Sequence, residues 1–281
     1  MPRKSERLYF RGIPIHFSLA VPENSRGTGP VQHALIISSP LVPLRLWQRI
    51  EDELVANRCL AVTVELPGFA GSYQPGDIPT DPALLATMLW GLLDSVDARY
   101  KTPLSMWHII SHGTSGNIAL QMVRQSPGSV SSQVYISPVF ALELPQNIVR
   151  MREIYSSAVS TRSAFARFLS YYIKNSEPLD RETIDAMHGE LSRRGSMDTF
   201  IRTLRQAQVT RLRGMDFGPT MMIFGRLDPL CTEQALREAD RLLPGCEKHA
   251  LGNCGHYPMI THNKATCDFL RGWLRFIERG H

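Results

Sequence analysis

The sequence predicts an α/β fold, in which a mostly parallel sheet is flanked by helices and a helical cap is inserted into the chain. Short apolar runs alternate with helix-like segments over most of the 281 residues. The apolar runs are nearly continuous, which is typical of strands buried on both faces of a parallel sheet. One long segment, residues 140–214, breaks the alternation and shows only helical patterns. We therefore expect a core of residues 1–139 and 215–281 and a cap, or lid, of residues 140–214.

The expected strands begin with a hairpin. In RLYFRGIPIHFSL (residues 7–19) apolar residues alternate on both sides of Arg11 and Gly12, as in two antiparallel strands joined by a tight turn. Six further runs are short and rich in β-forming residues, so they are expected to complete the sheet. These runs are HALIIS (33–38), CLAVTVEL (59–66), LSMWHII (104–110), QVYIS (133–137), TMMIFG (220–225) and EKHALG (247–252).

Helices are expected between these strands. The clearest is the last, because its large apolar side chains recur at the 3.6-residue spacing of one helix face. A helix with such a face covers a sheet by burying that face against it. The expected helices span residues 45–57, 82–99, 116–125, 232–242 and 262–278, and the stripe of the last one consists of Phe269, Leu270, Trp273, Leu274 and Ile277.

The cap segment contains four helix-like stretches, NIVRMREIYSSAV, TRSAFARFLSYYIKN, LDRETIDAMHGELSRRG and MDTFIRTLRQAQV. They lie between strands expected near residues 135 and 222, so we expect them over the carboxyl edge of the sheet, where open α/β sheets bind ligands. A lid there would bury a small substrate and exclude water. We expect the aromatic residues of the cap to pack its helices together rather than to contact a ligand; they are Phe165, Phe168, Tyr171, Tyr172 and Phe200.

Composition narrows the classes of partner. The net charge of +5 is spread along the chain, whereas nucleic-acid binders gather their basic residues on one stripe, so no nucleic-acid partner is expected. No apolar run approaches the roughly 18 residues of a membrane span, so no membrane partner is expected. The five cysteines are scattered without a disulfide framework, which favours a reducing, cytoplasmic setting. The expected partner is a small molecule, and no pattern indicates an oligomeric state.

Three motifs follow expected strands in a fixed order. They are VELPGFAGS (64–72), FGRLDPLC (224–231) and GNCGHYPMITHN (252–263). In this order and at these positions they resemble the motifs of the α/β-hydrolase family, and the resemblance extends over nearly the whole chain. It implies the α/β-hydrolase fold. It also implies that Asp228 corresponds to the catalytic acid of the family and His256 to the catalytic histidine.

The resemblance extends to the nucleophile elbow, which in the family reads Gly-x-Ser-x-Gly and holds the serine on a strained strand-to-helix turn. In SHGTSGNIA (residues 111–119) the best alignment places Gly113 at the nucleophile position and Thr114 directly after it. Glycine adopts a positive φ without strain, so a chain that no longer uses the hydroxyl can take glycine there. In the alternative register Ser115 is the nucleophile, and Asn117 then occupies a position where the family has glycine.

A second departure concerns the oxyanion hole, whose usual His-Gly-x sequence aligns with Ser38, Ser39 and Pro40. Proline has no N–H to donate to an oxyanion. Loss of one such donor removes roughly 3–4 kcal/mol of transition-state stabilisation. Two alternatives remain open, namely that Leu41 supplies the donor or that the hydroxyl of Ser38 or Ser39 replaces it.

These features favour an enzyme that acts on a small, largely apolar substrate beneath the cap. His256, oriented by Asp228, would supply general acid–base chemistry near neutral pH without a serine nucleophile. The resemblance to the family implies that such chemistry can be a lyase, cyclase or oxygenase-like reaction. Two alternatives stay open: an ester or thioester hydrolase that uses Ser115, and a ligand-binding protein without catalysis. No cofactor is expected. No metal is expected either, because Cys246, Cys254 and His256 lack the paired spacing of metal ligands.

Overall fold

The computed structural model describes residues 3–22, 32–74, 76, 78–100, 106–140, 148–174, 179–206 and 217–280. These residues form an eight-stranded sheet in the order β1-β2-β4-β3-β5-β6-β7-β8. This sheet, with helices on both sides, confirms the predicted fold class. The strands are β1 (Arg3–Phe10), β2 (Ile13–Ala20), β3 (Gln32–Ile37), β4 (Cys59–Val64), β5 (Trp107–His112), β6 (Val130–Ile136), β7 (Thr220–Gly225) and β8 (Glu247–Leu251).

Strand pairing follows the expected topology. β1 and β2 form the predicted antiparallel hairpin, and β2 also pairs antiparallel with β4. From β4 through β3, β5, β6 and β7 to β8 every pairing is parallel. β5 extends two residues past its expected end. The apolar pattern stops at residue 110 because Ser111 and His112 are polar, although both are buried in the structure.

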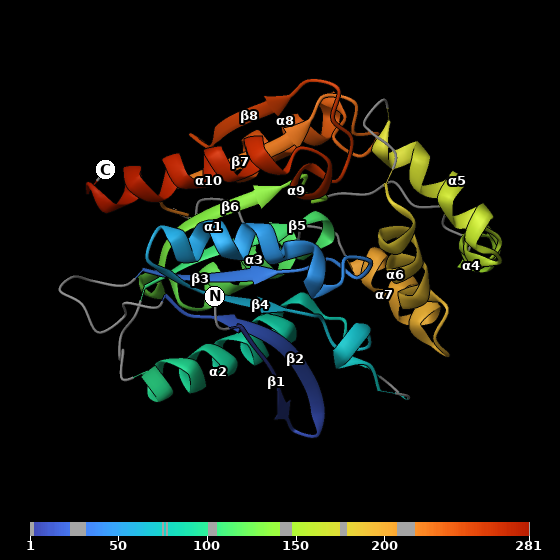
Figure 1. Cartoon of the computed structure of the whole chain (residues 1–281), viewed down its shortest axis with the longest axis horizontal. Helices are drawn as coiled ribbons and strands as arrows, with labels where there is room; N and C mark the ends of the chain where they lie inside the picture. The colour runs from blue at the N-terminus through green and yellow to red at the C-terminus, as the bar shows by residue number, and fades with distance from the viewer. Residues whose placement is uncertain are drawn as a thin grey trace.

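Four long helices of the core contact one another in two pairs. The first pair is α1 (Gln48–Ala56) with α10 (Asn263–Glu278), and the second is α2 (Pro82–Tyr100) with α3 (Gly116–Gln125). Figure 1 shows α1 in front of the sheet and α3 behind it. Helix α8 (Glu233–Leu242) follows β7, and the short α9 (Pro258–Thr261) precedes α10. All five helices expected in the core are present.

The described residues between β6 and β7 form four helices. They are α4 (Ile148–Val159), α5 (Arg162–Ile173), α6 (Arg181–Leu191) and α7 (Ser196–Gln206). Figure 1 shows them beyond the carboxyl ends of the parallel strands, the edge at which the strand arrows point. No strand occurs among the described residues of this segment, as its helical pattern predicts. Residues 141–147, 175–178 and 207–214 of the expected cap lie outside the described residues.

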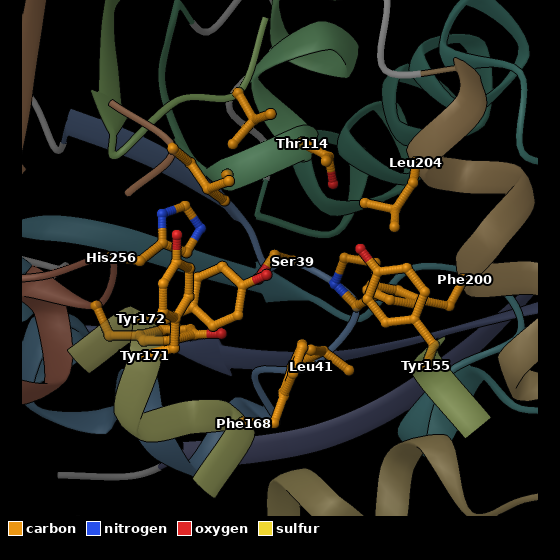
Figure 2. A pocket seen from close by; sticks show the side chains of 15 residues that line it. Ser39, Leu41, Thr114, Tyr155, Phe168, Tyr171, Tyr172, Phe200, Leu204 and His256 are labelled. Carbon is orange, nitrogen blue, oxygen red and sulfur yellow. The ribbon is translucent and has the colours of Figure 1, made fainter. Parts of the chain in front are cut away.

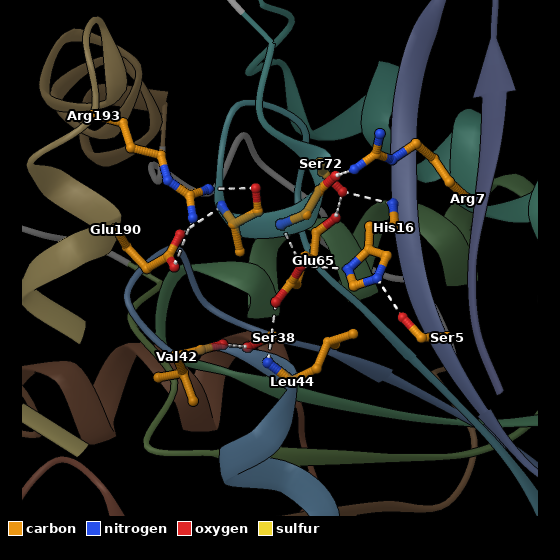
Figure 3. Close-up of polar contacts among 12 residues, drawn as sticks. Ser5, Arg7, His16, Ser38, Val42, Leu44, Glu65, Ser72, Glu190 and Arg193 are labelled. Atoms are coloured by element: carbon orange, nitrogen blue, oxygen red, sulfur yellow. Dashed lines mark hydrogen bonds and ion pairs between the residues drawn. The ribbon is translucent and has the colours of Figure 1, made fainter. Parts of the chain in front are cut away.

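The loop after β4 is held by a buried carboxylate (Figure 3). Glu65 accepts hydrogen bonds from the Leu44 and Gly71 N–H groups, at 3.1 and 2.7 Å, and from His16 Nδ1 at 2.7 Å. At the tip of the loop the Ala70 N–H donates to Glu190 of α6. The loop that begins with the VELPGF motif therefore ties the sheet to the helices at its carboxyl edge.

Candidate active site

Two ionisable residues expected at the site are in direct contact. Asp228 lies in the loop after β7, and His256 lies in the loop between β8 and α9. His256 Nδ1 donates a hydrogen bond to Asp228 Oδ2 at 2.8 Å, and both side chains are buried. The other carboxylate oxygen, Asp228 Oδ1, accepts from the Leu230 N–H at 2.8 Å. The structure therefore joins the acid and the histidine in the arrangement that the resemblance implies.

The surroundings of Asp228 keep it ionised. Burial acts to raise the pKa of this carboxyl group, but the nearby His256, its hydrogen bond and the Leu230 N–H together hold the pKa below its usual value. An ionised carboxylate fixes the proton of the neutral imidazole on Nδ1. The Nε2 atom of His256 is then free to accept a proton. Figure 2 shows the His256 ring among the side chains that line a cavity.

Backbone contacts fix the position of His256. Its N–H donates to the Tyr172 carbonyl in the last turn of α5, at 2.8 Å. Its own carbonyl accepts from His112 Nε2, at 2.9 Å. The preceding Gly255 allows this approach, since a Cβ there would lie only 1.9 Å from the Tyr172 carbonyl oxygen. The loop of His256 is thus held between the end of β5 and the end of α5.

Gly113 is the elbow residue at which an added Cβ would face the His256 imidazole. It follows β5 directly, begins a short 3-10 helix and has a φ of +57°, in the left-handed region. A Cβ at this position would lie 3.4 Å from His256 Nε2 and 3.7 Å from Ser39 Cβ. A side chain at residue 113 would therefore point at the imidazole. No other glycine within the described residues has His256 among the neighbours of such a Cβ.

Ser115 has a different environment. Its side chain is completely buried, and its hydroxyl donates to the Ser38 carbonyl at 2.9 Å. It is absent from the described residues that line the cavity, whereas Gly113 and Thr114 are among them. A serine whose hydroxyl donates its hydrogen to a buried carbonyl is poorly placed to attack a ligand. The geometry therefore favours the register in which Gly113 occupies the nucleophile position.

The region expected to hold an oxyanion lies on the same cavity wall. Ser39, Pro40 and Leu41 line the cavity, while Ser38 is buried behind them. The Ser38 hydroxyl donates to the Val42 carbonyl and accepts from Trp47 Nε1 at 2.8 Å. Its hydrogen is therefore unavailable to a ligand. Pro40 brings no N–H to the wall, and Leu41 keeps one, so Leu41 and Thr114 are the remaining candidates for backbone donors.

The cavity has a volume of about 280 Å³ and a largely apolar wall. Helices α4, α5 and α7 contribute aromatic and aliphatic side chains, among them Tyr155 and Leu204. Four of the five aromatic residues that are expected to pack these helices together also line the cavity. Phe165 is fully buried and does not line the cavity, but the others do: Phe168, Tyr171, Tyr172 and Phe200. Figure 2 shows these rings facing the same space as His256.

The positions of two residues of the site, His112 and Tyr155, are not predicted by the family motifs. His112 lies at the variable position of the elbow, yet it is buried and contacts both Ser39 Oγ, at 2.8 Å, and the carbonyl of His256. Tyr155 of α4 lines the cavity from a helix whose sequence carries no motif. The polarity of His112 at the end of a strand is the hint of the first of these positions, because a polar group that is buried needs a partner.

Burial keeps two histidines of β5 neutral. Burial, followed by the nearby His33, lowers the pKa of His108 to about 4, and burial, followed by the nearby His256, lowers that of His112 to about 3. The folded state then binds these protons more weakly than the unfolded chain, in which the pKa is near 6.5. Their contribution to stability is therefore complete above pH 6.5 and declines as the pH falls toward 4 and 3.

We expect the free energy of unfolding to be about 3–4 kcal/mol lower at pH 5 than at pH 7, because two protons must be excluded from the folded state. Urea titrations at the two pH values measure the difference. His108→Gln, which removes one of the two groups, is expected to show about half of the wild-type pH effect. Equal stability at both pH values would contradict the assignment of these histidines as neutral.

The remaining expectations concern other ligands. Cys254 is buried, and burial raises the pKa of its thiol to about 11, so it is no reactive nucleophile. Within the described residues no group of histidine, cysteine and acidic side chains has the arrangement of a metal site. Among the described helices none has both the length and the apolar character needed to cross a bilayer.

Comparison with known proteins identifies the family of the chain. The model of the alpha/beta hydrolase family matches residues 39–269, which include both halves of the dyad and the elbow. This chain belongs to the α/β hydrolase family. Its fold, with an eight-stranded, mostly parallel sheet flanked by helices, is the α/β-hydrolase fold, as the motifs imply.

Two curated hydrolases share low but extended similarity with the chain. A 2-hydroxy-6-oxononadienedioate/2-hydroxy-6-oxononatrienedioate hydrolase of Dechloromonas aromatica is 23% identical over 243 residues, which cover 80% of each chain. A hydrolase of the same name from Cupriavidus pinatubonensis is 22% identical over 240 residues, again 80% of each chain. These relatives are hydrolases by name, and they place the chain among enzymes of the family.

Solved structures of other α/β hydrolases superimpose over almost the whole chain. A bacterial membrane phospholipase A has a TM-score of 0.80 at 17% identity, covering 99% of this chain and 87% of that one. A serine hydrolase involved in carbazole degradation has a TM-score of 0.74 at 12% identity, covering 98% and 100%. At such identities the likeness establishes the fold of the family and leaves the reaction open.

Proposed function

We propose that this α/β hydrolase relative is an enzyme that uses the His256–Asp228 dyad for acid–base chemistry without a serine nucleophile. One observation carries the proposal: His256 Nε2 faces the position of a side chain at residue 113, and that residue is Gly113. Ser115, the alternative nucleophile, donates its hydroxyl hydrogen to the Ser38 carbonyl instead. The dyad thus retains a base, while the group that such a base activates in serine hydrolases is missing.

The chemistry follows from the dyad alone. His256 Nε2 would take a proton from a substrate hydroxyl, an acidic C–H group or a water molecule. The positive charge that forms on the imidazole is stabilised by the Asp228 carboxylate at 2.8 Å. The same imidazolium can return the proton later in the reaction, as lyase, cyclase and oxygenase-like reactions require. No cofactor is needed for these proton transfers.

We also propose that residues 140–214 act as the lid of this site and that residues 1–139 and 215–281 form the core. In support, α4, α5 and α7 supply many of the apolar side chains of the cavity, including Tyr155 and Phe200. Contacts between Glu190 and the Ala70 N–H, and between Arg45 and Glu182, join the lid to the core loops. Water excluded by such a lid strengthens the electrostatic interactions of the dyad.

The cavity wall favours an uncharged, largely apolar substrate. The dienedioate substrate in the names of the two relatives carries two carboxylates, which cationic side chains would recognise. Among the described residues that line this cavity there is neither lysine nor arginine, and His256 is the only basic side chain. We therefore propose that the substrate is small but lacks the two carboxylates of a dienedioate.

A second candidate is a ligand-binding protein without catalysis. Two independent departures from a hydrolytic site favour it, namely Gly113 at the nucleophile position and Pro40 at the oxyanion position. It differs from the first candidate in one testable respect. Mutation of His256 would then change ligand affinity only, because no proton transfer would depend on it.

The two candidates are separated by a reaction that needs nothing except a base in an apolar cavity. In the elimination of 5-nitrobenzisoxazole a base removes the C–H proton, the N–O bond breaks, and a coloured cyanophenolate forms. We expect catalysis by the wild-type protein and a loss of at least about 100-fold in His256→Ala, the usual contribution of a positioned base. His249→Ala is the control, because His249 lies on β8 against Phe269 and does not line the cavity.

A rate that is unchanged in His256→Ala would contradict a base at this position. If the wild type binds 5-nitrobenzisoxazole without any catalysis, the result would favour a ligand-binding protein. A burst of p-nitrophenol from p-nitrophenyl acetate that disappears in Ser115→Ala would instead favour the serine hydrolase.

A further inference from the structure

A chain of hydrogen bonds runs behind the cavity wall from Ser39 to the loop of His256. Ser39 Oγ lies 2.8 Å from His112 Nδ1, and His112 Nε2 lies 2.9 Å from the His256 carbonyl oxygen. His112 is completely buried between them, at the end of β5. Ser39 itself is half-buried and lines the cavity. The direction of each hydrogen bond decides what Ser39 can offer to a ligand.

The direction of each hydrogen bond follows from the last acceptor, the His256 carbonyl. A carbonyl oxygen only accepts, so His112 Nε2 must carry a hydrogen and donate it to the His256 carbonyl. A neutral imidazole carries only one such hydrogen, which leaves His112 Nδ1 as an acceptor. Burial, reinforced by the nearby His256, lowers the pKa of His112 to about 3 and keeps this ring neutral near pH 7. The Ser39 hydroxyl is therefore the donor to His112 Nδ1.

The Ser39 hydroxyl can consequently accept a hydrogen bond from a ligand in the cavity but cannot donate one. A hydroxyl group has a single hydrogen, and that of Ser39 is committed to His112. The geometry therefore disfavours the alternative in which the Ser39 hydroxyl replaces a missing oxyanion donor. The adjacent Pro40 has no hydrogen to offer, so two consecutive residues of the former oxyanion wall present no donor.

A second acceptor faces the same space. A Cβ on Gly113 would lie 3.4 Å from His256 Nε2 and 3.7 Å from Ser39 Cβ, so both residues border the position that a nucleophile would fill. With Nδ1 donating to Asp228, His256 Nε2 accepts as well. The space beside Gly113 is therefore bordered by two hydrogen-bond acceptors, one of which is a base.

We propose that this space selects a ligand hydroxyl that donates its hydrogen, as in a phenol, enol or alcohol, and that Ser39 is the specificity-determining acceptor for it. From these two acceptors a carbonyl oxygen gains no hydrogen bond, whereas an O–H group gains one. The proposal rests on the proposed function in that the cavity of His256 is taken as the ligand site. It adds the chemical class of the ligand.

The test is a comparison of three aromatic ligands whose size suits a cavity of about 280 Å³. 2-Naphthol carries an O–H donor, 2-methoxynaphthalene carries the same oxygen without the hydrogen, and naphthalene carries neither. Equilibrium dialysis at pH 7 gives the Kd of each for the wild type and for Ser39→Ala. We expect the wild type to bind 2-naphthol about tenfold more tightly than either of the others, as one net hydrogen bond allows.

In Ser39→Ala the affinity for 2-naphthol is expected to fall by about fivefold to tenfold, while the affinity for naphthalene stays unchanged and shows an intact cavity. A stronger preference for 2-methoxynaphthalene, or an equal loss for all three ligands, would overturn the proposal. His112→Phe gives a second readout, because it frees the Ser39 hydrogen and should weaken the preference for the donor ligand. All of these measurements concern binding alone, so an absence of turnover would count against the proposed function without affecting them.

Discussion

A Gly255→Ala variant is expected to lose about 3 kcal/mol or more of folding free energy, near the upper end of the effects of overpacking. The added Cβ would lie 1.9 Å from the Tyr172 carbonyl oxygen and 2.5 Å from that of Ile173. Both oxygens belong to the backbone of α5, so no rotation of a side chain relieves the contact. The helix and the loop of His256 must therefore move apart, which breaks the hydrogen bond from the His256 N–H to Tyr172.

Urea denaturation measures the loss, and the elimination reaction measures the displacement of the base. Gly252→Ala is the matched control, because a Cβ on this neighbouring glycine meets nothing within 4 Å. We expect the control to stay within about 0.5 kcal/mol of the wild type, as is usual for a surface substitution. A Gly255→Ala variant as stable and as active as the control would show that the close contact between α5 and the loop is unimportant.

A Gly113→Ser variant is expected to fold, to lose about 1–2 kcal/mol of stability and to gain ester hydrolysis. The loss follows from a φ of +57°, which is unfavourable for a residue with a Cβ. Space is sufficient, since the nearest atom to the new Cβ is His256 Nε2 at 3.4 Å. A hydroxyl one bond beyond this Cβ reaches the imidazole, which is the contact that activates a serine.

Gly113→Ala separates the two effects, because it has the same Cβ and the same strain without the hydroxyl. We expect equal melting temperatures for the two variants and a burst of p-nitrophenol from p-nitrophenyl acetate only in Gly113→Ser. The later turnover should stay slow, since Pro40 leaves the oxyanion wall one donor short. If Gly113→Ser is at least as stable as the wild type, the argument from backbone strain fails.

Much of the fold could be predicted from sequence patterns, and particular elements show why. The apolar stripe of α10 and the continuous apolar runs of β3, β4 and β7 reflect burial, which the sequence records directly. Asp228 and His256 were also predictable, because each follows a strand in a motif of the family. Strand ends of a parallel sheet meet at one edge, so two such loops are brought together whatever lies between them.

The surroundings of the dyad could not be predicted in the same way. His112 contacts the carbonyl of a residue 144 positions further along the chain, and the Tyr172 carbonyl holds His256 through a backbone atom that no sequence pattern encodes. Whether Phe168 and Tyr172 line the cavity depends on the rotation of α5 about its own axis. An aromatic residue on an amphipathic helix has the same pattern whether it packs against a helix or borders a cavity.

The direction of the hydrogen bond from Ser39 is a further case. The sequence leaves open whether the Ser39 hydroxyl donates to a ligand, and only the contact with His112 fixes its hydrogen. The consequence depends on three residues from separate segments, namely Ser39, His112 and His256. Hydrogen-bond direction is a property of the assembled site rather than of any motif.

The central claim, that the nucleophile position is vacant in a site that keeps its base, is tested most directly by a fluorophosphonate probe. The wild type and Gly113→Ser are incubated with the probe at pH 7.5, and any adduct is located by peptide mass spectrometry. We predict no adduct on the wild type and one adduct on residue 113 of the variant, which also proves that the probe reaches the site. An adduct on Ser115 of the wild-type protein would contradict the account and identify a serine hydrolase with a different elbow register.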